Sequence, residues 1–354
     1  MHSENLVSIL ERHGRDGTRL VQILREVQDA LGWLPPDAIT EIAAATATPR
    51  VRVESAAGFY GFFHTRPPGR YRVLWSDNVT DRMLGSRELM QAMCEKLWLE
   101  PGRVSEDGLV SVDATSCTGL CDQGPAILIN GRALPRMTPQ RVDEIAGLIR
   151  AETPLAEWPA EFFAVEDNIR RRDALLGHGL APGEALAAAL ERGPAALIGE
   201  VRASGLRGRG GAGFSTGIKW EACRNAPCLG DDTGRFVVCN ADEGEPGTFK
   251  DRVLLSSFAD LVFEGMTIAG FAVGARRGLL YLRGEYRHLL EPLESVLARR
   301  RCEKLLGANV LGKAFDFDIE IHLGAGAYVC GEESALIESL EGKPGRPRIR
   351  PPFP

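Results

Sequence analysis

The feature that most constrains the fold is an alternation of strand-like and helix-like segments after residue 200. Short runs rich in β-branched and aromatic residues, RFVVCNA at 235–241 and GLLYL at 278–282, are each followed by a loop and a helical pattern. The run FDFDIEIHL at 315–323 places apolar residues at every second position, as a half-buried strand does. Such alternation is typical of a largely parallel sheet covered by helices. We therefore predict an α/β domain over residues 181–354.

The residues before this domain divide into three parts. Residues 1–62 show the apolar spacing of helices, and we predict a helical segment there. Residues 63–150 show the order strand, helix, strand, hairpin, helix, with an Asn-Gly pair as the hairpin turn. That order is typical of a small thioredoxin-like α/β domain. Residues 151–180 are mixed and proline-containing, and we expect them to connect the two domains.

Composition excludes several classes of protein. Hydrophobic residues make up 44% and charged residues 25%, which is the balance of a folded chain. The net charge of −6 leaves no general excess of positive charge that would bind nucleic acid. The longest apolar segment, at 261–275, is too short to span a bilayer and contains Glu264. The start, MHSENLVSILERHGRDGT, carries charges where a signal peptide needs an apolar core. We predict a cytoplasmic protein that binds neither nucleic acid nor a membrane.

A glycine-rich stretch, GLRGRGGAGFSTGIKW at 205–220, contains a G-x-G-x-x-G pattern that starts at Gly208. The dinucleotide-binding turn with that pattern follows a strand, but the residues before this stretch have a helical pattern. One alternative is a flexible surface loop. However, Phe214 and Lys219 are not linker residues, and an aromatic ring and a cation beside bare backbone suit a flat, phosphate-bearing ligand.

Two further stretches combine polar residues with loops after strands. NADEGEPGTFKDR at 240–252 has four carboxylates, which suit a solvated turn, a cation site or acceptors for ribityl and ribose hydroxyls. GAGAYVCGEES at 324–334 lies between a strand and a helix, and such a helix N-terminus can face a phosphate. Glu332 and Glu333 also complement the helix dipole as ordinary first-turn residues. Beside Tyr328 they favour a polar nucleotide site.

Together, these three stretches resemble the flavin- and NADH-binding (51 kDa) subunit of respiratory complex I over residues 200–354. The first 150 residues resemble its thioredoxin-like small (24 kDa) partner subunit. The fusion of the two is similar to the diaphorase flavoprotein (alpha) subunits of NAD-reducing [NiFe]-hydrogenases. The resemblance implies a Rossmann-like FMN/NADH-binding domain and an NAD-linked flavin oxidoreductase. It implies hydride exchange between NAD(H) and FMN, and electron transfer to iron–sulfur clusters. The implied partners are a small diaphorase subunit with iron–sulfur clusters and a hydrogenase dimer.

The resemblance also implies which residues bind the cofactors. Glu245 and Glu333 are assigned to the catalytic centre, where we expect them to position NADH rather than to donate protons. The family usually has Lys where this chain has Arg350, which keeps the charge at the NAD site. The residues implied to bind FMN or NAD are Gly208, Arg209, Gly210, Gly211, Gly213, Phe214, Lys219, Asn240, Asp242, Glu243, Glu245, Tyr328, Gly331, Glu332, Glu333 and Phe353.

Two departures from the family pattern concern iron–sulfur clusters. The small-subunit family binds [2Fe–2S] through C-x4-C and C-x3-C pairs; Cys117 and Cys121 form the second, but Ser76 and Asp81 occupy the first. A cluster normally needs four thiolates. We therefore expect a remnant of a metal site and a scaffold that docks a partner, not a native cluster. The family's [4Fe–4S] segment and ubiquitin-like domain would lie beyond Pro354, so we expect a C-terminally truncated chain.

Two other functions remain open at this stage. The motifs after residue 200 would equally serve the flavoprotein subunit of an NAD-dependent formate dehydrogenase. The degenerate cysteine pattern and the abrupt end would also suit a non-catalytic, truncated assembly module.

Overall fold

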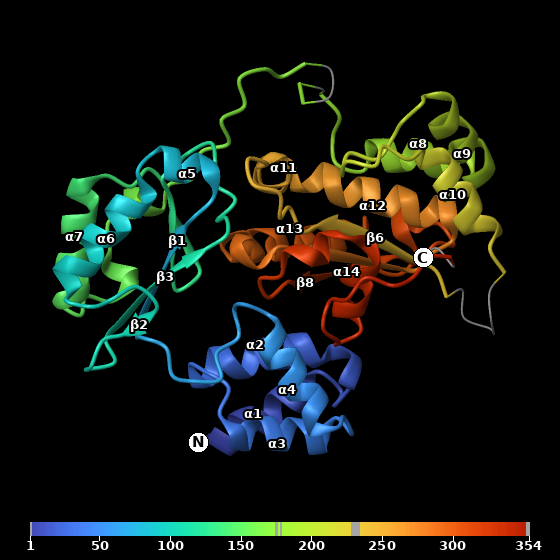
Figure 1. The fold of residues 1–354 in the computed structure, drawn as a ribbon. Coiled ribbons are helices and arrows are strands. Elements are labelled where there is room, and N and C mark those ends of the chain that lie inside the picture. The colour runs from blue at the N-terminus through green and yellow to red at the C-terminus, as the bar shows by residue number, and fades with distance from the viewer. Residues whose placement is uncertain (1, 174–175, 178, 228–233, 352–354) are drawn as a thin grey trace.

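The computed structural model describes residues 2–173, 176–177, 179–227 and 234–351. Figure 1 shows three parts: a group of N-terminal helices, a thioredoxin-like α/β domain and a second α/β domain. The predicted fold class is confirmed. Among the described residues, no single helix is long and apolar enough to cross a membrane; one pair of consecutive helices passes the length and composition test together, but is bent by 96°.

The helical segment folds as predicted, and its boundaries follow local signals. The first turn of α3 contains Pro36, whose fixed φ suits that position, and α2 ends at Gly32 in the left-handed conformation with φ of 83°. The elements are α1 (His2–Arg12), the 3-10 turn η1 (Gly17–Arg19), α2 (Leu20–Leu31), α3 (Pro36–Ala45) and α4 (Arg50–Phe59).

The thioredoxin-like domain has one five-stranded mixed sheet in the order β2-β3-β1-β4-β5. Strand β1 is central, parallel to β3 and antiparallel to β4. The predicted Asn-Gly turn joins β4 to β5, with both Asn130 and Gly131 at positive φ. After the last helix, Trp158 and Phe162 pack into the core of this domain. The elements are β1 (Tyr71–Ser76), α5 (Val79–Met83), α6 (Ser86–Leu97), β2 (Arg103–Val104), β3 (Val110–Thr115), β4 (Ile127–Ile129), β5 (Arg132–Leu134), α7 (Pro139–Arg150), η2 (Leu155–Glu157) and η3 (Ala160–Phe163).

The second domain has a parallel three-stranded sheet in the order β6-β7-β8. Helices α8 and α9 are separated at Gly193. The apolar segment at 261–275 falls mostly in α12, where the buried Glu264 accepts hydrogen bonds from the backbone N–H groups of Gly183 and Leu186. The elements are α8 (Glu184–Arg192), α9 (Pro194–Ala203), α10 (Thr216–Asn225), β6 (Phe236–Ala241), α11 (Lys250–Ser257), α12 (Ala259–Val273), β7 (Arg277–Leu282), η4 (Gly284–Leu289), α13 (Leu290–Cys302), η5 (Val310–Gly312), β8 (Asp318–Leu323), η6 (Tyr328–Gly331) and α14 (Glu333–Leu340).

The N-terminal helices help to cover the second sheet. On β7, Leu280 and Leu282 face the core formed with α12 and α13, whereas Tyr281 faces the core of the helical segment. Tyr60, at the end of α4, donates a hydrogen bond to Ser339 of α14 at 2.8 Å. A parallel sheet needs apolar cover on both faces. The helical segment and α14 supply the second layer, below the sheet in Figure 1.

Candidate functional site

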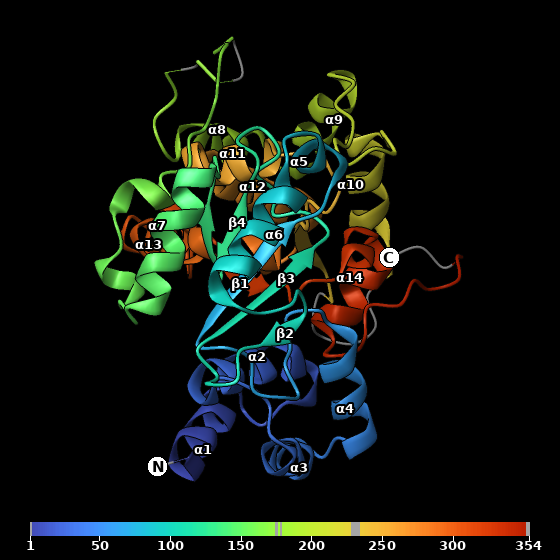
Figure 2. The same cartoon turned by 60° about the vertical axis from the view of Figure 1, so that its left-hand side comes forward.

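The site lies where the parallel strands of the second domain end. The three strands end level with one another, because Ala241 pairs with Leu282 and Leu282 pairs with Leu323. The acidic stretch follows β6, and the stretch containing Tyr328 follows β8. Ligands of open α/β sheets bind at this carboxyl edge. In Figure 2, α10 and α14 lie beside each other near this edge.

Direct contacts join the three polar stretches predicted from the sequence. Lys219 on α10 pairs with Glu333 on α14, with Nζ and Oε2 3.0 Å apart. The Asn240 side-chain amide donates to the Gly331 carbonyl at 2.9 Å. The Tyr328 hydroxyl donates to the Glu245 carboxylate. Residues 83 to 114 positions apart in the sequence are therefore in direct contact.

The glycine stretch forms a closed loop ahead of α10. The Gly208 N–H donates to the Phe214 carbonyl at 2.9 Å. Gly211 and Gly213 have φ of 113° and 62°, values that side-chain-bearing residues rarely adopt. A Cβ atom at Gly210, Gly211 or Gly213 would meet no atom within 4 Å, so bare backbone borders open space here. As predicted, a helix, α9, precedes the loop in place of the strand of a dinucleotide-binding turn.

The three stretches carry two exposed aromatic rings and an exposed cation. The Phe214 side chain is 58% exposed and that of Tyr328 is 63% exposed. Arg209, in the glycine loop, is also exposed. Large exposed rings are costly in water, and they suit stacking against a flat ligand. Phe353, the other predicted aromatic contact, lies outside the described residues.

Asp242 has a buried carboxylate oxygen with no hydrogen-bond partner among the described residues. This atom is Oδ2. Burial raises the pKa of Asp242 from 3.8 to about 7, the nearby Glu285 carboxylate adds to the effect, and Arg283 opposes it. A buried polar atom without a partner is costly, so Asp242 is suited to exchange a hydrogen bond with a ligand hydroxyl or N–H group.

Glu243, by contrast, is already engaged within the protein. Its carboxylate accepts hydrogen bonds from the N–H groups of Asp251 and Arg252, at the start of α11, and from the Tyr286 hydroxyl at 2.8 Å. Lys250 lies 3.8 Å away. These bonds hold the acidic stretch against α11 and η4, within the second domain.

Glu332 caps the helix that follows it. Its Oε2 accepts from the backbone N–H groups of Ser334 and Ala335, at 2.9 and 3.0 Å, and its carboxylate pairs with Arg350. Arg350 also contacts Glu333 at 2.8 Å. Two of the N-terminal N–H groups of α14 therefore donate to the chain's own carboxylate.

The cysteine pair lies at the contact between the two domains. The sulfur atoms of Cys117 and Cys121 are 3.4 Å apart and buried. The side-chain amide nitrogen of Asn78 lies between them and the other two family positions. It is 2.6 Å from Ser76 Oγ, 2.5 Å from Asp81 Oδ2, and 3.5 and 3.6 Å from the two sulfur atoms. The donors are two sulfur and two oxygen atoms around a protein amide, and they do not fit a [2Fe–2S] cluster.

Sequence reasoning missed one residue that joins the domains. Arg283 is buried, and its guanidinium donates to the carbonyls of Glu243 and Cys117, both at 2.5 Å, and to Glu285 at 2.9 Å. The sequence did contain a signal for Arg283, because a charged residue directly after a buried strand lies at the ligand-binding edge of the sheet. Sequence spacing could not reveal that it reaches the other domain.

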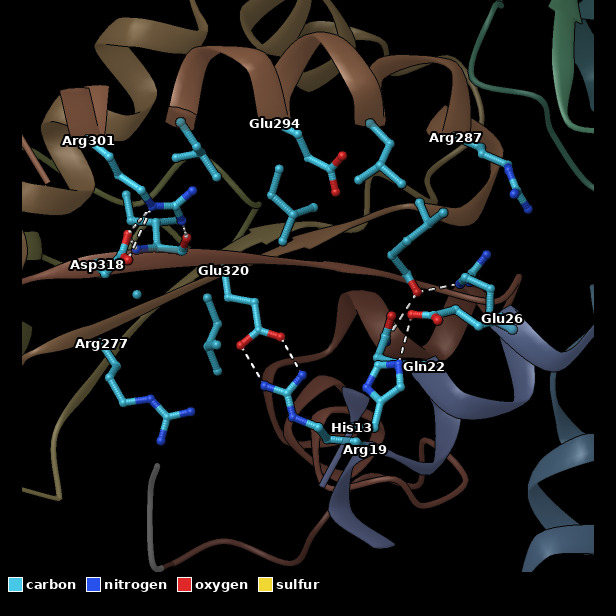
Figure 3. Close-up of a pocket in the computed structure, with 18 of the residues that line it drawn as sticks. His13, Arg19, Gln22, Glu26, Arg277, Arg287, Glu294, Arg301, Asp318 and Glu320 are labelled. Carbon is cyan, nitrogen blue, oxygen red and sulfur yellow. Dashed lines mark hydrogen bonds and ion pairs between the residues drawn. The ribbon is translucent and has the colours of Figure 1, made fainter. Parts of the chain in front are cut away.

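Two cavities lie near the second sheet. One of about 640 Å³ is lined by charged side chains of α2, α13 and β8, with Arg19 paired to Glu320 (Figure 3). None of the predicted site residues lines it. The other, of about 290 Å³, lies between the two domains and is lined by Asp242, Gly244 and Tyr328, among others. The smaller cavity is therefore the one that borders the predicted site.

Comparison with known proteins agrees with this architecture. Residues 201–354 match the family model of the Nuo51 FMN-binding domain, and residues 6–150 match that of the thioredoxin-like [2Fe–2S] ferredoxin. The chain is 41% identical to the alpha subunit of the NAD-reducing hydrogenase HoxS of Cupriavidus necator, over 99% of this chain and 60% of that protein. It is 51% identical to the mitochondrial 51 kDa subunit of NADH-ubiquinone oxidoreductase of Neurospora crassa, over 45% of this chain and 32% of that one.

A solved structure shares the same fold. A crystal structure of NAD+-reducing [NiFe]-hydrogenase in the air-oxidized state matches with a TM-score of 0.85 and 43% identity, over 96% of this chain and 57% of that one. The chain thus spans about 60% or less of the length of these relatives. Residues 201–354 are thus similar to Nuo51 FMN-binding domains, and residues 6–150 are similar to thioredoxin-like [2Fe–2S] ferredoxins.

Proposed function

We propose that this chain is the FMN- and NAD(H)-binding part of a diaphorase subunit in an NAD-reducing hydrogenase. The observation that carries the proposal is the convergence of the three polar stretches at the carboxyl edge of β6, β7 and β8. FMN, when bound, would accept a hydride from NADH and release electrons one at a time, or run in the reverse direction.

The described residues fit FMN in shape and in chemistry. The backbone at Gly210, Gly211 and Gly213 borders open space, and Phe214 is exposed at the end of this loop. Lys219 and Arg209 provide positive charge for a phosphate. Asp242 and Asn240 provide hydrogen-bond partners for hydroxyl and amide groups, and the buried Oδ2 of Asp242 gains the partner that it lacks.

NAD(H) would bind on the exposed side of the same surface. Phe214 is placed to stack against a flat ring, and Glu245 and Glu333 to hold the polar groups of the dinucleotide. Both carboxylates are half-buried or exposed and have partners, Tyr328 and Lys219, that fix their positions. We assign them a positioning role at the catalytic centre, because hydride exchange between the two cofactors needs no side-chain proton donor.

The electron acceptors are proposed to be iron–sulfur clusters outside this chain's described residues. A small diaphorase subunit and a hydrogenase dimer are the proposed partners, by similarity to the HoxS alpha subunit. We also propose a cytoplasmic location, since Cys302 is an exposed free thiol of the kind that reducing compartments preserve.

Reconstitution of the purified chain with FMN tests the proposal. We expect the chain to bind FMN, with quenching of flavin fluorescence, and to reduce ferricyanide with NADH. Lys219→Met is expected to weaken FMN binding by roughly tenfold, the effect of one charge-assisted hydrogen bond. Lys96→Met is the matched control, because Lys96 pairs with Asp143 on the other domain.

A chain that binds no FMN and oxidises no NADH, while its circular dichroism remains native, would support the assembly-module alternative. The partner is tested separately, by the metal content of the catalytic subunit that co-purifies from the source cell. Nickel and iron support the hydrogenase, whereas molybdenum would assign the chain to a formate dehydrogenase.

A further inference from the structure

The degenerate cluster position holds two thiols in mutual contact. Cys117 Sγ and Cys121 Sγ are 3.4 Å apart, and a disulfide requires that they approach to about 2.05 Å. Both sit in the loop between β3 and β4, and a displacement of little more than 1 Å would join them.

The surroundings distinguish the two thiols. The Gly119 N–H donates to Cys117 Sγ at 3.3 Å, and Arg283 lies close enough to donate to the Cys117 carbonyl. The Gly247 N–H donates to Cys121 Sγ at 3.2 Å, so each sulfur accepts a hydrogen bond from a different backbone segment. Two thiols in contact are the arrangement of an attacking and a resolving cysteine.

We propose that Cys117 and Cys121 are a reversible dithiol–disulfide pair, a modification site that hydrogen peroxide oxidises and a dithiol reductant restores. Both cysteines are at least nine-tenths buried. A small, neutral oxidant therefore suits the site better than a bulky one. The proposal concerns the thioredoxin-like domain and its contact with the acidic stretch, and it does not depend on flavin binding.

The oxidation proceeds in two balanced steps. The Cys117 thiolate attacks one peroxide oxygen, so that an S–O bond forms, the O–O bond breaks, and the released hydroxide takes a proton to become water. Cys121 then attacks Cys117 Sγ, its proton passes to the departing hydroxyl, and a second water leaves as the S–S bond forms. The two thiols lose two electrons and the peroxide gains them. Thiol–disulfide exchange with a dithiol reverses the change, and the reductant becomes the disulfide.

The state of the pair is transmitted to the predicted flavin domain through one hydrogen bond. The backbone N–H of Gly247, in the acidic stretch, donates to Cys121 Sγ at 3.2 Å. A disulfide sulfur is a weaker acceptor than a thiol or thiolate and lies displaced toward Cys117. Closure of the disulfide therefore weakens the anchor of the loop that contains Glu245.

Mass spectrometry of the flavin-free chain tests the proposal directly. Both cysteines fall in one tryptic peptide, residues 104–132, which contains no other cysteine. After reduction, desalting and peroxide treatment, we expect this peptide to lose two hydrogen atoms and both alkylatable thiols, and to recover them with dithiothreitol. Hydrogen exchange should show the Gly247 amide exchanging roughly fivefold faster in the oxidised chain, as for the loss of one hydrogen bond.

Two variants sharpen the result. In Cys121→Ser the resolving thiol is absent, so the peptide should instead gain oxygen at Cys117. In Cys302→Ser, which removes an exposed thiol elsewhere, the disulfide should form as in the wild type. The proposal fails if peptide 104–132 keeps two alkylatable thiols in excess peroxide. It also fails if the chain from cells carries iron and acid-labile sulfide that Cys117→Ser removes.

Discussion

At the residue scale, Asp242 links the stability of the chain to pH. Its carboxylate is buried near Glu285, and its pKa rises from 3.8 to about 7. The unfolded chain releases this proton near pH 4, whereas the folded chain keeps it until about pH 7. Over that window the folded state binds more protons, so the free energy of unfolding falls as the pH rises and levels off above it.

Asp242→Asn is therefore expected to remove this part of the pH dependence. The variant should gain stability relative to the wild type as the pH rises from 4 to 7, by up to about 4 kcal/mol at roughly 1.36 kcal/mol per pKa unit. Urea unfolding of the flavin-free chain at a series of pH values measures the difference. Asp143→Asn, at an exposed position, is the control, and parallel curves for wild type and Asp242→Asn would contradict the assignment.

At the element scale, the start of α14 depends on one side chain. The Glu332 carboxylate caps the backbone N–H groups of Ser334 and Ala335. Glu332→Ala is expected to lower the free energy of unfolding by about 1 kcal/mol, as for other lost helix caps. Glu332→Gln keeps an acceptor oxygen and should lose clearly less. Equal stability of the alanine and glutamine variants in urea titrations would show that the cap contributes little.

The same helix shows how far the sequence could predict the elements. Periodicity located the strand, the glycine loop and the helix around Tyr328, because these depend on local spacing. Whether Glu332 faces a ligand or its own helix depends on a rotamer and on Arg350, and local spacing contains no information about either. In the same way, the sequence predicted that Ser76 and Asp81 break the cluster motif, but not that Asn78 fills the space between the four positions.

At the scale of the whole molecule, the two α/β domains are joined by buried polar contacts. Arg252, from α11, contacts both oxygens of Asp122 at 2.7 Å, and both side chains are buried. The two domains also pack closely at Gly119, where a Cβ atom would come within 2.3 Å of the Tyr286 ring. Asp122 directly follows Cys121, so the thiol pair and the ion pair belong to one contact surface. No sequence pattern could reveal this surface, since its halves are more than 100 residues apart.

This ion pair is expected to couple the unfolding of the two domains. Removal of one partner leaves a buried charge, and Arg252→Met or Asp122→Leu should each cost about 3–5 kcal/mol. The double variant buries neither charge, so it should cost less than the sum, with a coupling energy of about 1–3 kcal/mol. Urea unfolding followed by fluorescence and circular dichroism measures both the energies and the coincidence of the transitions.

If the ion pair holds the two domains together, the single variants should unfold in two separate steps. The domain with the unpaired buried charge should unfold first, because it has lost its contact with the other domain. A strictly additive double variant, with all transitions coincident, would show instead that the apolar contacts around Gly119 and Tyr286 are sufficient to hold the domains as one unit.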